Sequence, residues 1–168
     1  MRKKIGIRDI VLVGIMTATI EVSKLAMSYL PNIEPVTLLI VLYSLVFGPM
    51  VFYAIAVFVL LEGLLYGFGI WWVVYLYIWP LLTALTLLFR KKNSLLFWTV
   101  FSTLFGLFFG LLSAGPTLIL SGPAAAFSYF IAGIPFDLLH GAGNCVLMLV
   151  LYVPLRRILT RLRDTQSV

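Results

Sequence analysis

The sequence predicts an all-α integral membrane protein, a single domain over residues 1–168 formed by a bundle of six transmembrane helices. Its composition excludes a soluble domain, because 62% of the residues are hydrophobic and only 11% are charged, with a mean hydropathy of +1.12. Soluble domains carry about 25% charged residues. Eleven of the twelve basic residues fall in three short clusters separated by apolar sequence: Arg2, Lys3, Lys4 and Arg8; Arg90, Lys91 and Lys92; and Arg156, Arg157, Arg161 and Arg163.

The three basic clusters predict the orientation in the cell membrane. Lys and Arg concentrate in short cytoplasmic segments beside transmembrane helices, so we expect all three clusters and both termini on the cytoplasmic side. The net charge of +6 comes from these flanks and indicates contact with the lipid bilayer, with no nucleic acid partner. The single cysteine, Cys145, excludes an intrachain disulfide and a multi-cysteine metal site.

A proline-rich break separates the first two expected helices. The first covers about residues 9–30 and follows basic residues, as the apolar part of a signal peptide would. It continues past Glu21 to Leu30 without a small-residue cleavage pattern, so we interpret it as a retained helix. Pro31 to Pro35 ends it, because proline removes a backbone donor and disfavours helix in the preceding residue. The second helix, 36–47, ends at the turn signal Gly48-Pro49.

Four further helices are expected after this turn. They cover residues 50–65, 71–89 with Pro80 inside, 95–112, and a last segment that begins at 127 or 133 and ends at 155. The stretch Ser113 to Ala126 is rich in Gly, Ser, Ala and Pro and is predicted to be a loop. Helices 36–47 and 50–65 have no basic flanks. A single re-entrant unit is therefore an alternative for these two, and it leaves the termini on the same side.

The few polar residues inside the helices are predicted to lie in the outer half of the membrane. At 1.5 Å per residue, Glu21 lies roughly 20 Å from the cytoplasmic edge of a core about 30 Å thick, and Asp137 roughly 28 Å. Ionised side chains in hydrocarbon are costly and usually face a partner or a water-filled cavity. We therefore expect a polar pocket open to the outside, lined by these groups and by Lys24, Glu34, Glu62, His140 and Asn144.

Helical spacing groups these residues further, and each group allows a structural interpretation as well. Asp137, His140 and Asn144 share one helix face, and Glu21 and Lys24 share another. Glu21 and Lys24 form either a structural ion pair or a ligand contact. His140 taken alone is also typical of a hydrogen-bonded packing residue. Glu34 alone is also typical of a solvated loop charge.

Aromatic residues are concentrated near the predicted outer turn between the third and fourth helices. An interfacial aromatic belt accounts for most of them, and a stacking platform for a ligand is the alternative, formed by Tyr66, Trp71, Trp72 and Tyr75. On the first helix, Gly14 and Ala18 form a small-xxx-small pattern typical of close helix contact.

Taken together, these features resemble the substrate-binding S component of energy-coupling factor (ECF) vitamin transporters. The resemblance rests on the six-helix architecture and on two motifs, Gly14-Ile15-Met16-Thr17-Ala18 and a Gly-x-x-x-Asp-x-x-His-Gly-x-x-Asn run. The residues of that run are Gly133, Asp137, His140, Gly141 and Asn144. The resemblance implies that Gly14 and Ala18 contact a transmembrane coupling subunit. It also implies gating loops at residues 31–35, 66–72 and 113–126.

The same resemblance implies a binding subunit that acts with partners and is not itself an enzyme. The chain has no Gly-x-x-x-x-Gly-Lys-Ser/Thr motif for ATP, so we expect no cofactor in it and ATP use by two partner ATPase subunits. A cobalamin-type vitamin is the favoured substrate, because the pocket lacks an arginine clamp for an anion. Thiamin, pantothenate and a queuosine precursor remain alternatives.

Two other classes of function remain open. An intramembrane enzyme would use Asp137 and His140 as an acid–base pair, although Ser113, Ser121 and Ser128 carry no nucleophile motif. A scaffold subunit without a ligand would need no pocket at all.

Overall fold

The computed structural model describes residues 6–30 and 32–165, and within these residues the chain is helical with no β-strand. The prediction of an all-α protein is confirmed. The helices are α1 (Ile7–Ala26), α2 (Val36–Phe47), the 3-10 turn η1 (Gly48–Met50), α3 (Val51–Tyr66), α4 (Ile70–Leu88), α5 (Leu95–Leu107), α6 (Phe109–Ser113) and α7 (Gly115–Thr165).

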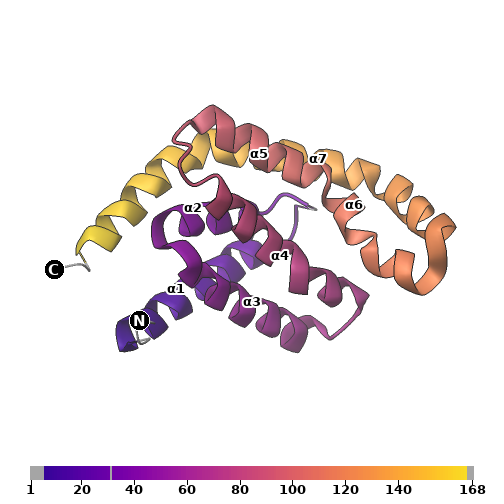
Figure 1. Cartoon of the computed structure of the whole chain (residues 1–168), viewed down its shortest axis with the longest axis horizontal. Helices are drawn as coiled ribbons and strands as arrows, with labels where there is room; N and C mark the ends of the chain where they lie inside the picture. Colours follow the sequence, from indigo (N-terminus) through magenta and orange to yellow (C-terminus); the bar gives the residue numbers. More distant parts are fainter. Residues whose placement is uncertain (1–5, 31, 166–168) are drawn as a thin grey trace.

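Three helical stretches in the described part of the chain are long and apolar enough to cross a membrane. They are α4, α7 and the stretch from Val36 to Tyr66, which consists of α2, η1 and α3. This last stretch contains a turn at Gly48. The glycine there has a positive φ of 67°, which residues with a Cβ rarely adopt. Figure 1 shows α2 and α3 running in opposite directions on either side of this turn.

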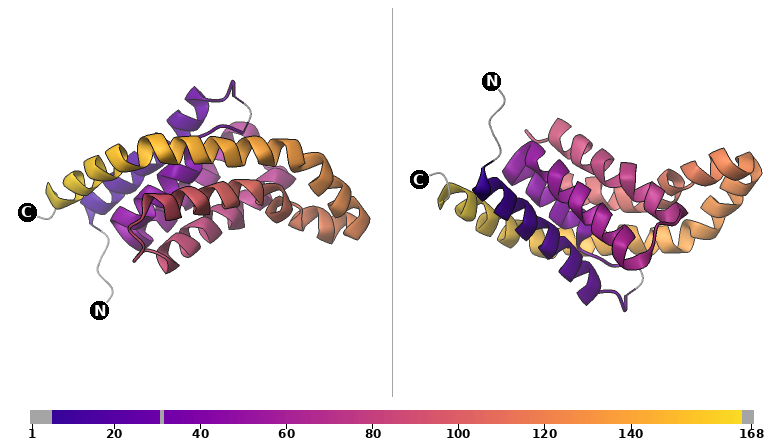
Figure 2. Two further views of the ribbon diagram at one scale, coloured as in Figure 1. Left: turned by 90° about the horizontal axis from the view of Figure 1, so that it is seen from above. Right: turned by 90° about the horizontal axis from the view of Figure 1, so that it is seen from below.

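The long helices alternate in direction, so the bundle has two distinct ends (Figures 1 and 2). The start of α1, the α4–α5 turn and the end of α7 lie at the same end, which we call the basic end because Arg8, Arg90–Lys92 and Arg156–Arg163 are there. Arg156 donates a 3.0 Å hydrogen bond to Asn93 and so ties α7 to the α4–α5 turn. The predicted basic residues Arg2, Lys3 and Lys4 lie outside the described residues, as does Pro31 of the predicted first break. We call the opposite end the distal end.

Helix α2 lies in the centre of the bundle. Ten of its twelve residues are buried, and it packs against α1, α4 and α7. A helix that is apolar on all sides needs such surroundings, which explains why α2 has no polar face. The hydroxyl of Thr17 on α1 donates a 3.1 Å hydrogen bond to the carbonyl oxygen of Ala54 on α3, so these two helices lie in contact.

The predicted loop from Ser113 to Ala126 is wrong, because almost all of it is helical. α6 ends at Ser113, α7 begins at Gly115, and the helical backbone breaks only at Gly122, with φ 81° and ψ 178°. Pro116 and Pro123 each stand in the first turn of a helical run, where the missing N–H has no partner to lose. The turns around Gly122 extend beyond the other distal helix ends, shown in orange in Figure 1.

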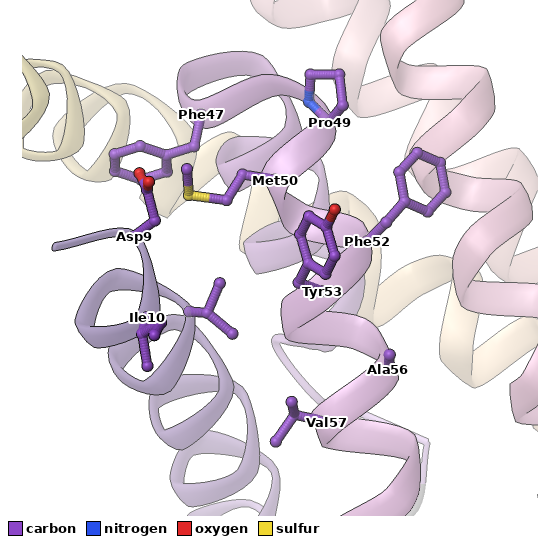
Figure 3. A pocket seen from close by; sticks show the side chains of 10 residues that line it. Asp9, Ile10, Phe47, Pro49, Met50, Phe52, Tyr53, Ala56 and Val57 are labelled. Atoms are coloured by element: carbon purple, nitrogen blue, oxygen red, sulfur yellow. The ribbon is translucent and has the colours of Figure 1, made fainter. Parts of the chain in front are cut away.

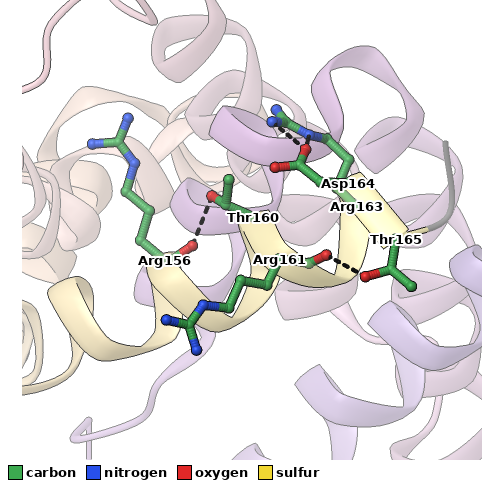
Figure 4. Close-up of polar contacts among 6 residues, drawn as sticks. All are labelled: Arg156, Thr160, Arg161, Arg163, Asp164 and Thr165. Atoms are coloured by element: carbon green, nitrogen blue, oxygen red, sulfur yellow. Dashed lines mark hydrogen bonds and ion pairs between the residues drawn. The ribbon is translucent and has the colours of Figure 1, made fainter. Parts of the chain in front are cut away.

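The last helix is also longer than expected, because α7 continues beyond residue 155 and through the last basic cluster to Thr165. The hydroxyls of Thr160 and Thr165 donate to the carbonyl oxygens of Arg156 and Arg161 at 2.8 and 2.9 Å, and Arg163 pairs with Asp164 (Figure 4). The basic end therefore includes a helical extension with exposed guanidinium groups.

Glycines permit close contact between α5 and α7. A Cβ placed on Gly106 would lie 2.8 Å from the backbone nitrogen of Gly141 and 2.8 Å from Nδ2 of Asn144. These atoms belong to a helix backbone and to a buried side chain, so they have little room to move.

We expect Gly106→Ala to destabilise the protein by about 1–3 kcal/mol through overpacking, measured as a lower thermal melting temperature in detergent. Gly133→Ala is the matched control, because a Cβ there meets no atom within 4 Å. Equal melting temperatures for the two variants would contradict the tight α5–α7 contact.

Candidate functional site

A pocket of about 370 Å³ opens at the distal end, beside the break between α1 and α2. Its walls come from the end of α1, the following segment, the end of α3 and the start of α4. The lining residues are Lys24, Leu25, Met27, Ser28, Leu30, Asn32, Glu34, Glu62, Tyr66, Trp71 and Tyr75. Six of the eleven residues proposed from the sequence for the binding site are therefore together in one cavity.

An ion pair between Lys24 and Glu62 lies in this pocket. The sequence suggested that Lys24 pairs with Glu21, its neighbour on the same helix, but the ammonium group is bound by the carboxylate on α3. The Glu62 side chain is 1% exposed and that of Lys24 is 21% exposed. The Lys24 ammonium also lies 5.1 and 5.6 Å from the ring centres of Tyr66 and Tyr75, within range of a cation–π interaction.

Two more carboxyl groups lie within electrostatic range of this pair. Glu21 interacts with both Lys24 and Glu62, and Glu34 interacts with all three. One oxygen of Glu62, Oε1, and one of Glu21, Oε2, are buried without a hydrogen-bond partner among the described groups. Three acids thus surround one lysine, and part of their hydrogen-bonding capacity is unused.

The two tryptophans at the start of α4 face different surroundings. Trp71 lines the pocket, and its ring lies edge-on to Tyr75 with centroids 5.4 Å apart. Trp72 instead donates a 2.8 Å hydrogen bond to the carbonyl oxygen of Val59 and lines a separate groove between α3 and α4. The structure does not bring Trp72 into the pocket.

Asp137, His140 and Asn144 form a polar row on α7 that faces α5 and α6. None of the three lines the pocket. Oδ1 of Asp137 accepts a 2.9 Å hydrogen bond from the backbone amide of Gly110, and the Asn144 side chain donates at 3.0 Å to the carbonyl oxygen of Ser102. His140 packs against Phe109, with ring centroids 4.8 Å apart. The sequence left open a hydrogen-bonded packing role for His140. The ring contact fits packing, but its Nε2 is buried without a hydrogen-bond partner among the described groups.

A line of aromatic rings connects this polar row with the pocket. Tyr75 contacts Trp79 at 5.3 Å between centroids, Trp79 contacts Phe109 at 5.7 Å, and Phe109 contacts His140. Trp79 is fully buried and its indole nitrogen has no partner among the described groups. Trp79 and Phe109 have no sequence signal that distinguishes them, because buried aromatic residues in apolar helices are common.

A second and larger groove, of about 830 Å³, lies toward the basic end between α1 and the start of α3 (Figure 3). Its lining is mostly apolar and includes Ile10, Val13, Met50 and Val57. Gly14 and Ala18, the two predicted contact residues on α1, are exposed nearby along the same helix. A Cβ at Gly14 would meet no atom within 4 Å.

The described residues contain no group of three or more His, Cys, Asp or Glu side chains placed to hold a metal ion. The pocket residues that sequence reasoning missed are Leu25, Met27, Ser28, Leu30 and Asn32. Four of them precede the predicted Pro31 to Pro35 break, and Asn32 lies within it. Their signal was therefore their position in or next to that break.

Comparisons of the chain with protein-family models, with curated proteins and with solved structures found no match.

Glu34 makes the stability of the folded chain depend on pH. Burial raises the pKa of its carboxyl group from 4.5 to about 7, so the folded state holds a proton that the unfolded state releases. The free energy of unfolding therefore falls as pH rises from 4.5 to 7. We expect the melting temperature to fall by a few degrees over this range, and Glu34→Gln to reduce that fall.

The control for this measurement is Asp164→Asn, which removes an exposed carboxyl group at the basic end. It should leave the pH dependence unchanged. A Glu34→Gln profile identical to that of the wild type would show that Glu34 does not titrate in this way.

Proposed function

We propose that this chain is the substrate-binding subunit of a vitamin importer, of the type of the S components of ECF transporters. The observation that carries the proposal is the distal pocket, which is lined by Lys24, Glu34 and Glu62 and has Glu21 within electrostatic range. Ionisable groups inside membrane-spanning segments are costly and usually serve a ligand or a transport path. A concave site with a few convergent polar groups and aromatic walls is typical of small-molecule binding.

The proposed topology is six crossings with both termini in the cytoplasm of the cell. The alternating helix directions and the grouping of the basic residues at one end support it, because Lys and Arg favour the cytoplasmic side. With the basic end inside, the pocket opens to the outside. This is the side from which an importer collects its substrate.

The cavity volume favours a ligand smaller than cobalamin. At about 370 Å³ the pocket is near the lower end of the roughly 300–1,000 Å³ of small-molecule sites. Cobalamin, a corrin macrocycle with many amide side chains, needs much more room unless residues 27–35 move outward. Thiamin and a queuosine precursor fit the volume and the acidic lining better than cobalamin or the anionic pantothenate.

The proposed partners are a transmembrane coupling subunit and two ATPase subunits. The exposed small residues Gly14 and Ala18 permit the close approach of another helix. The apolar groove beside them, lined by Ile10, Val13 and Val57, offers this helix a complementary surface.

An enzyme with Asp137 and His140 as its acid–base pair is less well supported. Asp137 binds the backbone amide of Gly110, and His140 is 4% exposed and covered by Phe109. A general acid or base must reach its substrate within hydrogen-bond distance, and neither side chain lines the pocket.

Calorimetric titration of the detergent-purified chain with thiamin, pantothenate, a queuosine precursor and cobalamin tests the proposed function. We expect tight binding of one of them without chemical change. Turnover of a bound compound would support the enzyme, and the absence of binding to all four would favour a scaffold.

Gly14→Leu should separate binding from coupling. A Cβ at this exposed position meets no atom within 4 Å in the isolated chain, so folding and ligand binding should persist. We expect vitamin uptake and recovery of the coupling subunit in pull-downs to fall at least tenfold, since a loss of about 1.4 kcal/mol of contact energy has this effect.

Ala84→Leu is the matched control, because it adds a similar side chain at an exposed position toward the basic end of α4. It should preserve both uptake and partner recovery. Normal uptake by Gly14→Leu would exclude this face of α1 as the coupling surface.

A further inference from the structure

We propose that the distal pocket binds a positively charged group of its ligand, and that this group replaces the Lys24 ammonium between Glu62, Tyr66 and Tyr75. The inference rests on the proposed binding function and adds the charge class of the ligand. In the unliganded chain, Lys24 would then act as an internal occupant of a cation site.

The surroundings of the Lys24 ammonium are those of a cation site. It contacts a buried carboxylate, Glu62, and lies over the rings of Tyr66 and Tyr75 at 5.1 and 5.6 Å from their centres. Aromatic faces combined with an anion are the surroundings in which proteins bind organic ammonium groups. The cavity beside these groups continues along Trp71, whose ring face offers another surface for a cation or an aromatic ligand.

The balance of charge in the pocket also favours a cation. Glu21 and Glu34 lie within electrostatic range of Glu62, with Lys24 as the shared cation. An anionic ligand would have to enter beside the carboxylate of Glu62, and like charges at close range are unfavourable. A cationic ligand would pair with that carboxylate.

Glu62 has hydrogen-bonding capacity that the ion pair does not use. Glu62 is buried and its Oε2 binds Lys24, whereas its Oε1 contacts no N–H donor among the described groups and has the Glu21 carboxyl group near it. A buried oxygen without a donor is costly. The N–H groups of a ligand cation would supply donors to both oxygens.

Of the two partners in the ion pair, Lys24 is the one that is able to move. Glu62 is held inside the bundle on α3, whereas the Lys24 side chain is 21% exposed at the pocket and has a flexible four-carbon stem. Lys24 is therefore free to swing toward water when another cation enters. Its ammonium group would then be hydrated, and Glu62 would stay paired.

Three small probes of matched shape and different charge test the proposal: 2-phenylethylamine as the cation, 3-phenylpropionate as the anion and 3-phenylpropanamide as the neutral compound. Binding is measured by calorimetric titration of the detergent-purified full-length chain. We expect saturable binding of the cation alone. Lys24→Met should tighten it about tenfold if the lysine occupies the site about nine-tenths of the time.

Glu62→Gln should abolish binding of the cationic probe, and the exposed Lys91→Met, on the α4–α5 turn, should leave it unchanged. Lys24→Met leaves Glu62 without its cation and so risks misfolding. Lys24→Gln, which retains a hydrogen-bond donor, is therefore measured beside it, and the double variant Lys24→Met/Glu62→Gln removes both charges. The double variant should melt like the wild type and fail to bind the cation.

If the wild-type chain binds the anionic probe and Lys24→Met does not, the cation proposal is overturned, whereas the proposed binding function is not. Weaker binding of the cation to both Lys24 variants would also overturn the cation proposal, as would binding of none of the three probes. The vitamin titrations distinguish failure of the cation proposal from failure of the proposed function. Binding of any one of the four vitamins supports a binding subunit, whatever the sign of the charge on that vitamin.

Discussion

The free energy of burying ionised groups in an apolar bundle is the constraint on which the rest of the structure depends. Glu62 is enclosed on α3, and removing one partner from a buried ion pair typically destabilises a protein by about 3–5 kcal/mol. In the unliganded chain, the pair with Lys24 therefore joins α1 to α3 at the distal end. The Thr17–Ala54 hydrogen bond joins the same helices nearer the basic end. These two contacts hold the helix pair that borders both the pocket and the larger groove.

The interior contains two polar regions with different roles. Around Lys24 the groups are charged, partly unpaired and open to a cavity. On α7 the polar side chains of Asp137 and Asn144 bind backbone groups of Gly110 and Ser102, which fixes α7 against α5 and α6. Aromatic rings from Tyr75 to Phe109 lie between the two regions, so a ligand in the pocket has a packed contact route to His140.

Local sequence patterns predicted most helix bounds because hydropathy and prolines act over a few residues. The turn at Gly48 and the ends of α3 and α4 lie within one or two residues of the expected positions. The helical stretch around Pro116 and Pro123 was not predicted, because its glycines and prolines were interpreted as loop signals. Proline is nevertheless tolerated in a first helical turn. The partner of Lys24 was missed for a different reason. Spacing along one helix favoured Glu21, whereas Glu62 is 38 positions away in sequence and reaches Lys24 only through helix packing.

Native mass spectrometry of the detergent-purified wild-type chain tests most directly the central claim, that the distal pocket holds a small molecule. We predict a non-covalent adduct that is lost in Trp71→Ala, which alters the pocket wall, and kept in Trp72→Ala, which alters the neighbouring groove. Wild-type protein without any adduct, or an adduct that both variants retain equally, would contradict the account.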